Sequence, residues 1–305
     1  MISRPTKILI IGSAGAVGSN IIRKVIFDKL PYQLVGVDDL SSDNSEKNLY
    51  VNKNYSFHLA TALDIKILEK IFDLEKPDAV INLLQCKNPI DEIQGMHNII
   101  QCCLSRGIDK IVYLSTDQVY SSPSGAKEDD ACSADNVCSI AKLACENLLQ
   151  ISRLKYTILR PTSVFGIRQD AHSLLPYAIA SIIDQFDFPD AGINHNLISM
   201  DDLIDCILLS ISSTEMDRRI FNVSTSFNLT DGALINLIAS LLNKSGVKSP
   251  TTSKEIPFSQ EVSLDSSELI SQGWQAKSSN IAGLEQVVKW YSNNRWFLNL
   301  SSFGS

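Results

Sequence analysis

The sequence has no long apolar run and no excess of basic residues. None of its apolar runs approaches the roughly 18 residues of a membrane span, and its start lacks the apolar stretch and cleavage site of a signal peptide. Lys and Arg total 27 against 34 Asp and Glu, for a formal net charge of −7. A mildly acidic chain without basic runs is a poor candidate for nucleic-acid binding. We expect neither a membrane nor a nucleic acid as a partner.

Cysteine spacings typical of a metal site or a disulfide framework are also missing. The seven cysteines are an odd number, form no C-x-x-C pair, and accompany only four scattered histidines. Structural zinc sites need ligands at characteristic spacings, and disulfide frameworks belong to secreted chains. We therefore expect reduced thiols in a cytoplasmic protein without a metal site.

Short apolar runs alternate with longer helical patterns in the first half of the chain. Strands are expected at 7–11, 33–37, 78–84, 110–115 and 156–160, and helices at 17–30, 65–74, 90–106 and 138–152. Strands that alternate with helices form right-handed βαβ units and a parallel sheet covered on both faces. The sequence thus predicts an α/β fold with a Rossmann-like doubly wound parallel sheet.

The pattern loosens after residue 166. Helices are expected at 174–185, 201–213, 231–242 and 281–293, with short strands and loops between them, and 244–266 is expected to be mostly loop. We therefore predict a nucleotide-binding domain over residues 1–166. A smaller mixed α/β substrate-binding part follows over residues 167–305, with some chain crossing between the two.

A glycine-rich turn lies between the first expected strand and the first expected helix. It reads Gly12-Ser-Ala-Gly15-Ala-Val-Gly18. Glycine permits a tight turn and lets backbone N–H groups approach a pyrophosphate, whose charge the helix N-terminus favours. The order of strand, turn and helix indicates a dinucleotide site. A purely structural turn in an unrelated α/β protein is the alternative.

An acidic pair ends the second expected strand. Asp38 lies 20 residues after Gly18, and Asp39 follows it. A carboxylate in this place accepts hydrogen bonds from the ribose hydroxyls and repels a 2′-phosphate. Because no Arg or Lys lies in 41–46, NAD is expected as the cofactor rather than NADP.

Motifs along nearly the whole chain resemble those of the extended short-chain dehydrogenase/reductase superfamily. They are the G-x-x-G-x-x-G turn with V-D-D-L-S-S after it, I-V-Y-L-S-T-D-Q-V-Y at 111–120, L-R-P-T-S-V-F-G at 159–166, and S-M-D-D-L at 199–203. Within the superfamily, the chain resembles the NAD-dependent nucleotide-sugar epimerases and dehydratases. The resemblance implies a retained NAD, a nucleotide-sugar substrate and a homodimer.

The resemblance also implies binding positions. Cofactor contacts are implied at Gly12, Ala14, Gly15, Ala16, Val17, Gly18, Asp38, Asp39, Asp64, Ile65, Leu83, Leu84, Lys142 and Pro161. Substrate contacts are implied at Gln85, Gln118, Val119, Arg168 and His195. His195 stands where the family has an arginine for the substrate diphosphate, and a mostly neutral imidazole is a weaker partner for two phosphates. Arg168 is a remaining cation that can serve.

The catalytic helix departs from the family pattern. The family carries Tyr-x-x-x-Lys, but this chain has Cys138-Ser-Ile-Ala-Lys142, with Glu146 on the same helix face. The resemblance implies Thr116 in the place of the catalytic Ser or Thr, Asp117 as the acid of dehydratases, and Lys142 as the residue that positions the nicotinamide ribose. The acid strength of a thiol, with an ordinary pKa of about 8.5, suits proton transfer. Its reach does not, because it is shorter than a phenol.

Two further departures affect the chemistry. Gln118 follows Asp117 where the dehydratases have a glutamate, and an amide cannot abstract a proton. Glu92-Ile-Gln-Gly95 replaces the N-x-x-G of the family, so its asparagine is missing. The cofactor half of the motif set is thus kept more faithfully than the catalytic half.

Three interpretations of Cys138 stay open. It is a buried small residue on a helix that has lost redox catalysis, or Asp117, Tyr120 or a water replaces it in proton transfer, or the thiol itself acts as acid, base or nucleophile.

We consider three functions for the chain. The first is an NAD-dependent nucleotide-sugar enzyme of the epimerase/dehydratase type with altered proton-transfer residues. The others are a catalytically silent NAD(H)-binding regulatory or scaffold protein, and a reductase of 4-keto sugar nucleotides.

Overall fold

The structure is a computed structural model that describes residues 5–42, 45–85, 88–120, 125–189, 192–243, 264–277 and 280–298. Cys86 and most of the loop expected at 244–266 lie outside the described residues. None of the helices in the described ranges is both long and apolar enough to cross a lipid bilayer.

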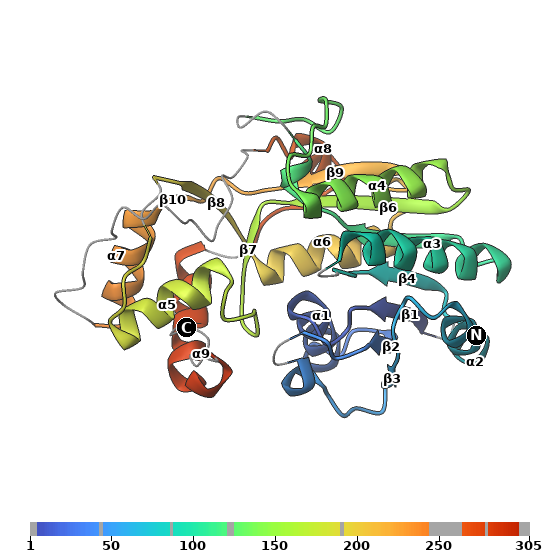
Figure 1. The fold of residues 1–305 in the computed structure, drawn as a ribbon, viewed down its shortest axis with the longest axis horizontal. Helices are drawn as coiled ribbons and strands as arrows, with labels where there is room; N and C mark the ends of the chain where they lie inside the picture. Colours follow the sequence, from blue (N-terminus) through green and yellow to red (C-terminus); the bar gives the residue numbers. More distant parts are fainter. Residues whose placement is uncertain are drawn as a thin grey trace.

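Within the described residues, seven parallel strands form the large sheet (Figure 1). They are β1 (Thr6–Ile11), β2 (Tyr32–Asp38), β3 (Tyr55–Leu59), β4 (Ala79–Asn82), β5 (Lys110–Leu114), β6 (Lys155–Pro161) and β9 (Arg219–Val223). Their order is β3-β2-β1-β4-β5-β6-β9, and all neighbouring strands run parallel. The predicted doubly wound parallel sheet is confirmed.

Helices cover both faces of this sheet. They are α1 (Ala16–Phe27), α2 (Ile65–Glu75), α3 (Pro89–Ser105), α4 (Val137–Ile151) and α6 (Met200–Ser212). On β1, Ile8 and Ile10 pack in one hydrophobic cluster with α1 and α6, whereas Leu9 and Ile11 pack in another with α2, α3 and α4. This alternation follows from the two-residue period of a strand, so each face of the sheet has its own core.

Both edge strands of the large sheet, β3 and β9, are missing from the strands that the sequence pattern predicts by range, and β3 has the weakest apolar pattern. Its five residues, Tyr-Ser-Phe-His-Leu, show no alternation of buried and exposed positions, and all are at least partly exposed. It pairs with β2 from Leu34 opposite Tyr55 to Asp38 opposite Leu59. An edge strand has one hydrogen-bonded neighbour and a weak apolar signal, which explains the omission.

A second, smaller sheet lies at one end of the molecule, at the left in Figure 1. It consists of β7 (Ser163–Phe165), β8 (Asn194–Ser199) and β10 (Asn228–Thr230), with β8 parallel to β7 and antiparallel to β10. Its helices are α5 (Leu174–Asp184), α7 (Asp231–Leu241) and α9 (Asn280–Asn293). They share one apolar core with residues of β7 and β8. The predicted smaller mixed α/β part is confirmed, while α6, β9 and the short α8 (Ser267–Ser271) return to the large sheet.

Candidate active site

The strand order of the large sheet reverses between β1 and β4, because β2 and β3 continue on one side and β5 and β6 on the other. In open α/β sheets, ligands bind beside the carboxyl ends of the strands at this switch point. The glycine turn follows β1 there, and Leu83 and Leu84 follow β4. The Leu83 N–H donates to the carbonyl of Ile11, so the two strand ends lie side by side.

The glycine turn is too tightly folded for side chains at two of its positions. Gly12 has φ +79°, a left-handed conformation that favours glycine. A Cβ at Gly18 would lie 2.4 Å from the carbonyl oxygen of Gly12. The turn therefore closes directly beneath the first turn of α1.

The N-terminus of α1 is open to an anion. Its N-cap residue, Gly15, offers no side-chain cap, and its first turn contains no acidic residue. By contrast, Asp64 caps α2 and Asn88 caps α3 with side-chain oxygens. Uncapped N–H groups and the positive end of the helix dipole together suit a phosphate. Ala16 and Val17, the first residues of α1, lie in this turn as predicted cofactor contacts.

Asp38 connects the end of β2 to the glycine turn. Its carboxylate accepts hydrogen bonds from the N–H of Ala14 at 2.9 Å and from the N–H of Leu40 at 2.8 Å. Burial raises the pKa of Asp38, and the two backbone hydrogen bonds partly oppose that shift. Its neighbour Asp39 is exposed and accepts from the N–H of Ser41 at 3.0 Å. Asp38 is therefore the better-placed carboxylate for a ribose.

The predicted adenine contacts lie at the start of α2. Asp64 Oδ1 accepts hydrogen bonds from the N–H groups of Lys66 and Ile67 at 3.0 and 3.1 Å. Ile65 is the first residue of the helix. One oxygen of the Asp64 carboxylate is thus committed to capping α2.

The predicted catalytic Thr116 follows β5 and caps a short 3-10 turn, η2 (Asp117–Val119). Its hydroxyl donates to Asp117 Oδ1 at 3.1 Å and accepts from the N–H of Gln118 at 3.2 Å. Gln118 Oε1 in turn accepts from Asn136 at the start of α4, at 3.1 Å. Val119 is 0% exposed in a small apolar cluster, so its side chain is closed to the substrate contact predicted for it.

Lys142 lies at the carboxyl ends of β4 and β5, one turn inside α4. Its Nζ is 2.7 Å from Glu92 Oε1, and it donates to the carbonyls of Leu84 at 2.9 Å and Leu114 at 3.3 Å. The ammonium also lies 5.2 Å from the centre of the Tyr113 ring. The sequence marks Glu92 as a departure from the family, but gives no sign that it pairs with Lys142.

Cys138 is exposed, so its interpretation as a buried residue is wrong. It lies in the first turn of α4, next to a capping box formed by Asn136 and Ser139. Lys142 and Glu146, one and two turns further along the same face, are both buried. A rise of about 1.5 Å per residue carries the start of α4 about 6 Å from Lys142, toward the ligand side of the sheet.

Behind the catalytic segment lies a buried polar network. Glu146, 0% exposed, accepts from the Arg160 guanidinium through both carboxylate oxygens, at 3.0 and 2.6 Å, and from the Ser115 hydroxyl. Tyr120 accepts from Arg160 at 2.6 Å and donates to Asn222 at 2.8 Å. Burial raises the pKa of Tyr120 to about 12. The phenol is therefore engaged, which argues against Tyr120 as the replacement proton-transfer group.

Arg168 and His195, the two residues considered for the substrate diphosphate, both contact other residues of the chain. Arg168 donates to the carbonyl of Lys47 at 3.2 Å and to Asn48 Oδ1 at 3.3 Å, and its guanidinium stacks 4.7 Å from the Tyr50 ring. Since Asn48 also donates to the carbonyl of Ala14 at 2.9 Å, Arg168 supports the outside of the glycine turn. This role of Asn48 has no signal in the sequence motifs.

His195 is 1% exposed, and its Nε2 lies 2.7 Å from Asp231 Oδ1. Asp231 also accepts from the N–H of Ile193 at 3.0 Å. A diphosphate reaches this imidazole only if the core of the smaller part opens. The expected diphosphate contact is therefore replaced by a buried pair that fixes β8 to the start of α7. Of the remaining predicted contacts, Gln85 is exposed after β4, and Pro161 ends β6 opposite Val223.

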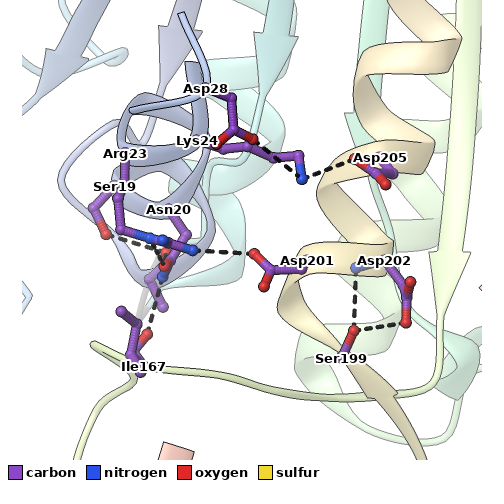
Figure 2. Close-up of polar contacts among 11 residues, drawn as sticks. Ser19, Asn20, Arg23, Lys24, Asp28, Ile167, Ser199, Asp201, Asp202 and Asp205 are labelled. Atoms are coloured by element: carbon purple, nitrogen blue, oxygen red, sulfur yellow. Dashed lines mark hydrogen bonds and ion pairs between the residues drawn. The ribbon is translucent and has the colours of Figure 1, made fainter. Parts of the chain in front are cut away.

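A separate cavity of about 340 Å³ lies between α1, α6, α9 and the chain after β7. Figure 2 shows α1 joined to α6 there by ion pairs of Arg23 with Asp201 at 3.0 Å and of Lys24 with Asp205 at 3.1 Å. Asn20 of α1 donates to the carbonyl of Ile167 at 2.9 Å. None of the predicted site residues lines this cavity. These contacts tie the cofactor helix to α6 on the same face of the large sheet and to the chain after β7.

A model of the NAD dependent epimerase/dehydratase family matches residues 8–224. The chain belongs to this family. The chain is 24% identical to dTDP-D-glucose 4,6-dehydratase of Mus musculus, in an alignment that covers 94% of this chain and 89% of that protein. Its fold is similar to that of dTDP-glucose 4,6-dehydratase from Bacillus anthracis in complex with NAD, with a TM-score of 0.87 and 18% identity over 96% of this chain and 98% of that one. The fold is also similar to that of UDP-glucose 4-epimerase from Thermotoga maritima with UDP-glucose. The TM-score is 0.82 and the identity 25%, over 95% of this chain and 100% of that one.

NAD is the cofactor of this family, which confirms the predicted cofactor. The residues of this chain fit it on three observations. The N-terminus of α1 has no side-chain cap, a Cβ would fill the turn at Gly18, and Asp38 lies beside that turn at the end of β2. Together they provide a phosphate site and a ribose partner at one strand end.

Proposed function

We propose that this protein is an NAD-dependent enzyme of the epimerase/dehydratase type that converts a nucleotide sugar, with altered proton-transfer residues. The observation that carries the proposal is the meeting of the uncapped α1, Asp38 and the Lys142 ammonium at the carboxyl edge of the sheet. Relatives named for dTDP-glucose and UDP-glucose chemistry support a nucleotide sugar as substrate. NAD, when bound, supplies a hydride acceptor for the sugar and returns the hydride at the end of the cycle.

Thr116 and Asp117 are the residues we assign to the reacting oxygen. The Thr116 hydroxyl can donate to a sugar oxygen once it turns from Asp117, which it now contacts at 3.1 Å. Asp117 is 5% exposed and begins the 3-10 turn η2 after β5. Its carboxyl group can give or take the proton that the tyrosine transfers in other members of the family. Lys142 positions the nicotinamide ribose. Gln85 and Gln118 then lie beside the same strand ends to contact the sugar nucleotide.

A second function, that of a silent NAD(H)-binding regulatory or scaffold protein, is favoured by one specific observation. The Lys142 ammonium has three N–H groups, and three acceptors surround it: the Glu92 carboxylate and the carbonyls of Leu84 and Leu114. A ligand must therefore displace one of these acceptors before it can bind the ammonium. With Cys138 in the place of the tyrosine, the site then has neither a phenol nor an available lysine. This function predicts normal NAD binding without turnover.

Product analysis on a panel of dTDP- and UDP-hexoses separates the two functions. The purified chain, its Thr116→Val variant and its Lys142→Met variant are incubated with each sugar nucleotide. The proposed enzyme converts at least one sugar and loses at least about tenfold of that rate in each variant. Conversion unaffected by both substitutions contradicts the residue assignment, and no conversion of any sugar favours the silent binder.

We also propose a homodimer that forms through α3 and α4. These helices pack side by side and expose large apolar residues: Ile90 (70%), Leu104 (48%), Val137 (61%), Ile140 (53%) and Ile151 (81%). Pairing of both helices with those of a second copy buries them in a four-helix interface. Light scattering should give twice the chain mass, and Ile140→Glu with Ile151→Glu should give the monomer. A monomeric unsubstituted chain contradicts this part of the proposal.

A further inference from the structure

Glu92 is a buried acid for which the family pattern provides no role. It lies in the first turn of α3 and is 3% exposed. Its Oε1 is 2.7 Å from Lys142 Nζ and accepts from the Tyr113 hydroxyl at 3.3 Å. A buried carboxylate is costly unless it is paired and hydrogen-bonded, so this contact explains how the acid is tolerated in the core.

The three acceptors around Lys142 come from three different elements. Glu92 belongs to α3, Leu84 follows β4, and Leu114 ends β5. The contacts lengthen in that order, from 2.7 to 2.9 to 3.3 Å. The Leu114 carbonyl is therefore the acceptor that an incoming hydroxyl displaces most easily, because it is the most distant of the three and, unlike Glu92, carries no charge.

The elements that carry two of these acceptors are closely packed. Gly95 lies one turn after Glu92 on α3, and a Cβ there would be 2.4 Å from Cδ2 of Leu84. The absence of a side chain at Gly95 lets α3 lie directly against Leu84. Glu92 and the Leu84 carbonyl thus belong to closely packed neighbouring segments, and both contact the ammonium.

We propose that Glu92 is a positioning residue that holds the Lys142 ammonium at the ends of β4 and β5, ready to bind a ribose hydroxyl of the cofactor. The hydroxyl takes the place of the Leu114 carbonyl, while the contacts to Glu92 and Leu84 persist. Glu92 acts on the cofactor only through Lys142. The inference rests on the proposed role of Lys142 at the nicotinamide ribose.

A double-mutant cycle on NAD affinity tests this coupling. Calorimetry on full-length chains freed of cofactor measures the Kd for NAD in the unsubstituted chain, Glu92→Gln, Lys142→Met and the combined variant. We expect a roughly tenfold weaker Kd for each single variant, as for loss of a charge-assisted contact, and a combined variant within about twofold of Lys142→Met. Additive losses, or an unchanged Kd in Glu92→Gln, overturn the inference. The matched control is Cys145→Ala, a buried change beside the Glu92 backbone, which should leave the Kd unchanged.

Loss of one partner of a buried ion pair can unfold a protein, so a second variant covers that case. Glu92→Met with Lys142→Met replaces the pair with apolar side chains of similar size, which are often tolerated in a core. This variant should have a melting temperature closer to that of the unsubstituted chain than either single variant, yet bind NAD as weakly as Lys142→Met. Binding as tight as in the unsubstituted chain means that the pair serves folding alone and overturns the inference. Failure of the unsubstituted chain to bind NAD contradicts the proposed function itself.

Discussion

The carboxylate of Asp38 accepts a hydrogen bond from the backbone N–H of Ala14 at 2.9 Å, which joins the end of β2 to the glycine turn after β1. The ribose partner and the phosphate turn are therefore one unit, and a change at Asp38 acts on both. This relationship is the basis of the first two predictions.

Asp38→Asn should weaken NAD binding by about 30-fold, or about 2 kcal/mol, because an amide replaces a charged acceptor in a half-buried place. Titration calorimetry measures the change. Asp39→Asn is the matched control, since Asp39 is exposed and contacts only the N–H of Ser41 among the hydrogen bonds described. Equal losses in both variants would contradict the assignment of the ribose to Asp38.

NAD binding should weaken as the pH falls through the raised pKa of Asp38. Burial is the main cause of that shift from the ordinary value of 3.8, and the protonated carboxyl no longer accepts through both oxygens. The folded chain also holds this proton more tightly than the unfolded chain. The contribution of Asp38 to the free energy of unfolding thus falls as the pH rises from 3.8 to the raised value. Calorimetry from about pH 4.5 to about pH 7.5 should show NAD binding weaken toward the lower pH. If the Kd of Asp38→Asn depends on pH in the same way, the dependence belongs to another group.

Gly18→Ala should destabilise the protein by about 2–3 kcal/mol and abolish NAD binding, because its Cβ would meet the Gly12 carbonyl oxygen at 2.4 Å. Gly232→Ala makes the same chemical change in the first turn of α7, where nothing lies within 4 Å of the added atom. It should stabilise by roughly 0.5 kcal/mol. Urea unfolding of both variants measures the difference in the free energy of unfolding. Similar effects of the two substitutions would mean that the turn can accommodate a Cβ at Gly18, which contradicts the prediction.

Glu146→Gln should reduce the free energy of unfolding by about 3–5 kcal/mol, because it leaves the buried Arg160 without its charged partner. Replacement of both residues by methionine should cost less than this single change. Urea denaturation measures the free energy of unfolding of each variant, and the variants are compared provided that the m-value is unchanged. If Glu146→Gln costs under about 1 kcal/mol, a typical surface-pair effect, the network does not hold the end of β5.

Local patterns account for what the sequence predicts well. Hydrophobic periodicity places β1 and α1, and glycine spacing places the turn between them, because each depends on neighbours within a few residues. Asp38 follows from its distance to Gly18 in a βαβ unit. The family, the cofactor and the sheet all derive from such local signals.

Contacts between distant segments account for what the sequence misses. The burial of His195 depends on Asp231 at the start of α7, and the engagement of Lys142 depends on Glu92 on another helix. Tyr120 is engaged by Arg160 and Asn222 from β6 and β9. No periodicity within one segment indicates these pairs, so the sequence alone could not predict them.

The most direct measurement of the central claim is the cofactor content of the purified chain before and after a nucleotide sugar is added. Denaturation of the fresh protein should release about one NAD per chain, and addition of a converted dTDP- or UDP-hexose should produce transient NADH absorbance without net loss of NAD. A chain that carries no NAD and binds none when it is added would contradict the account.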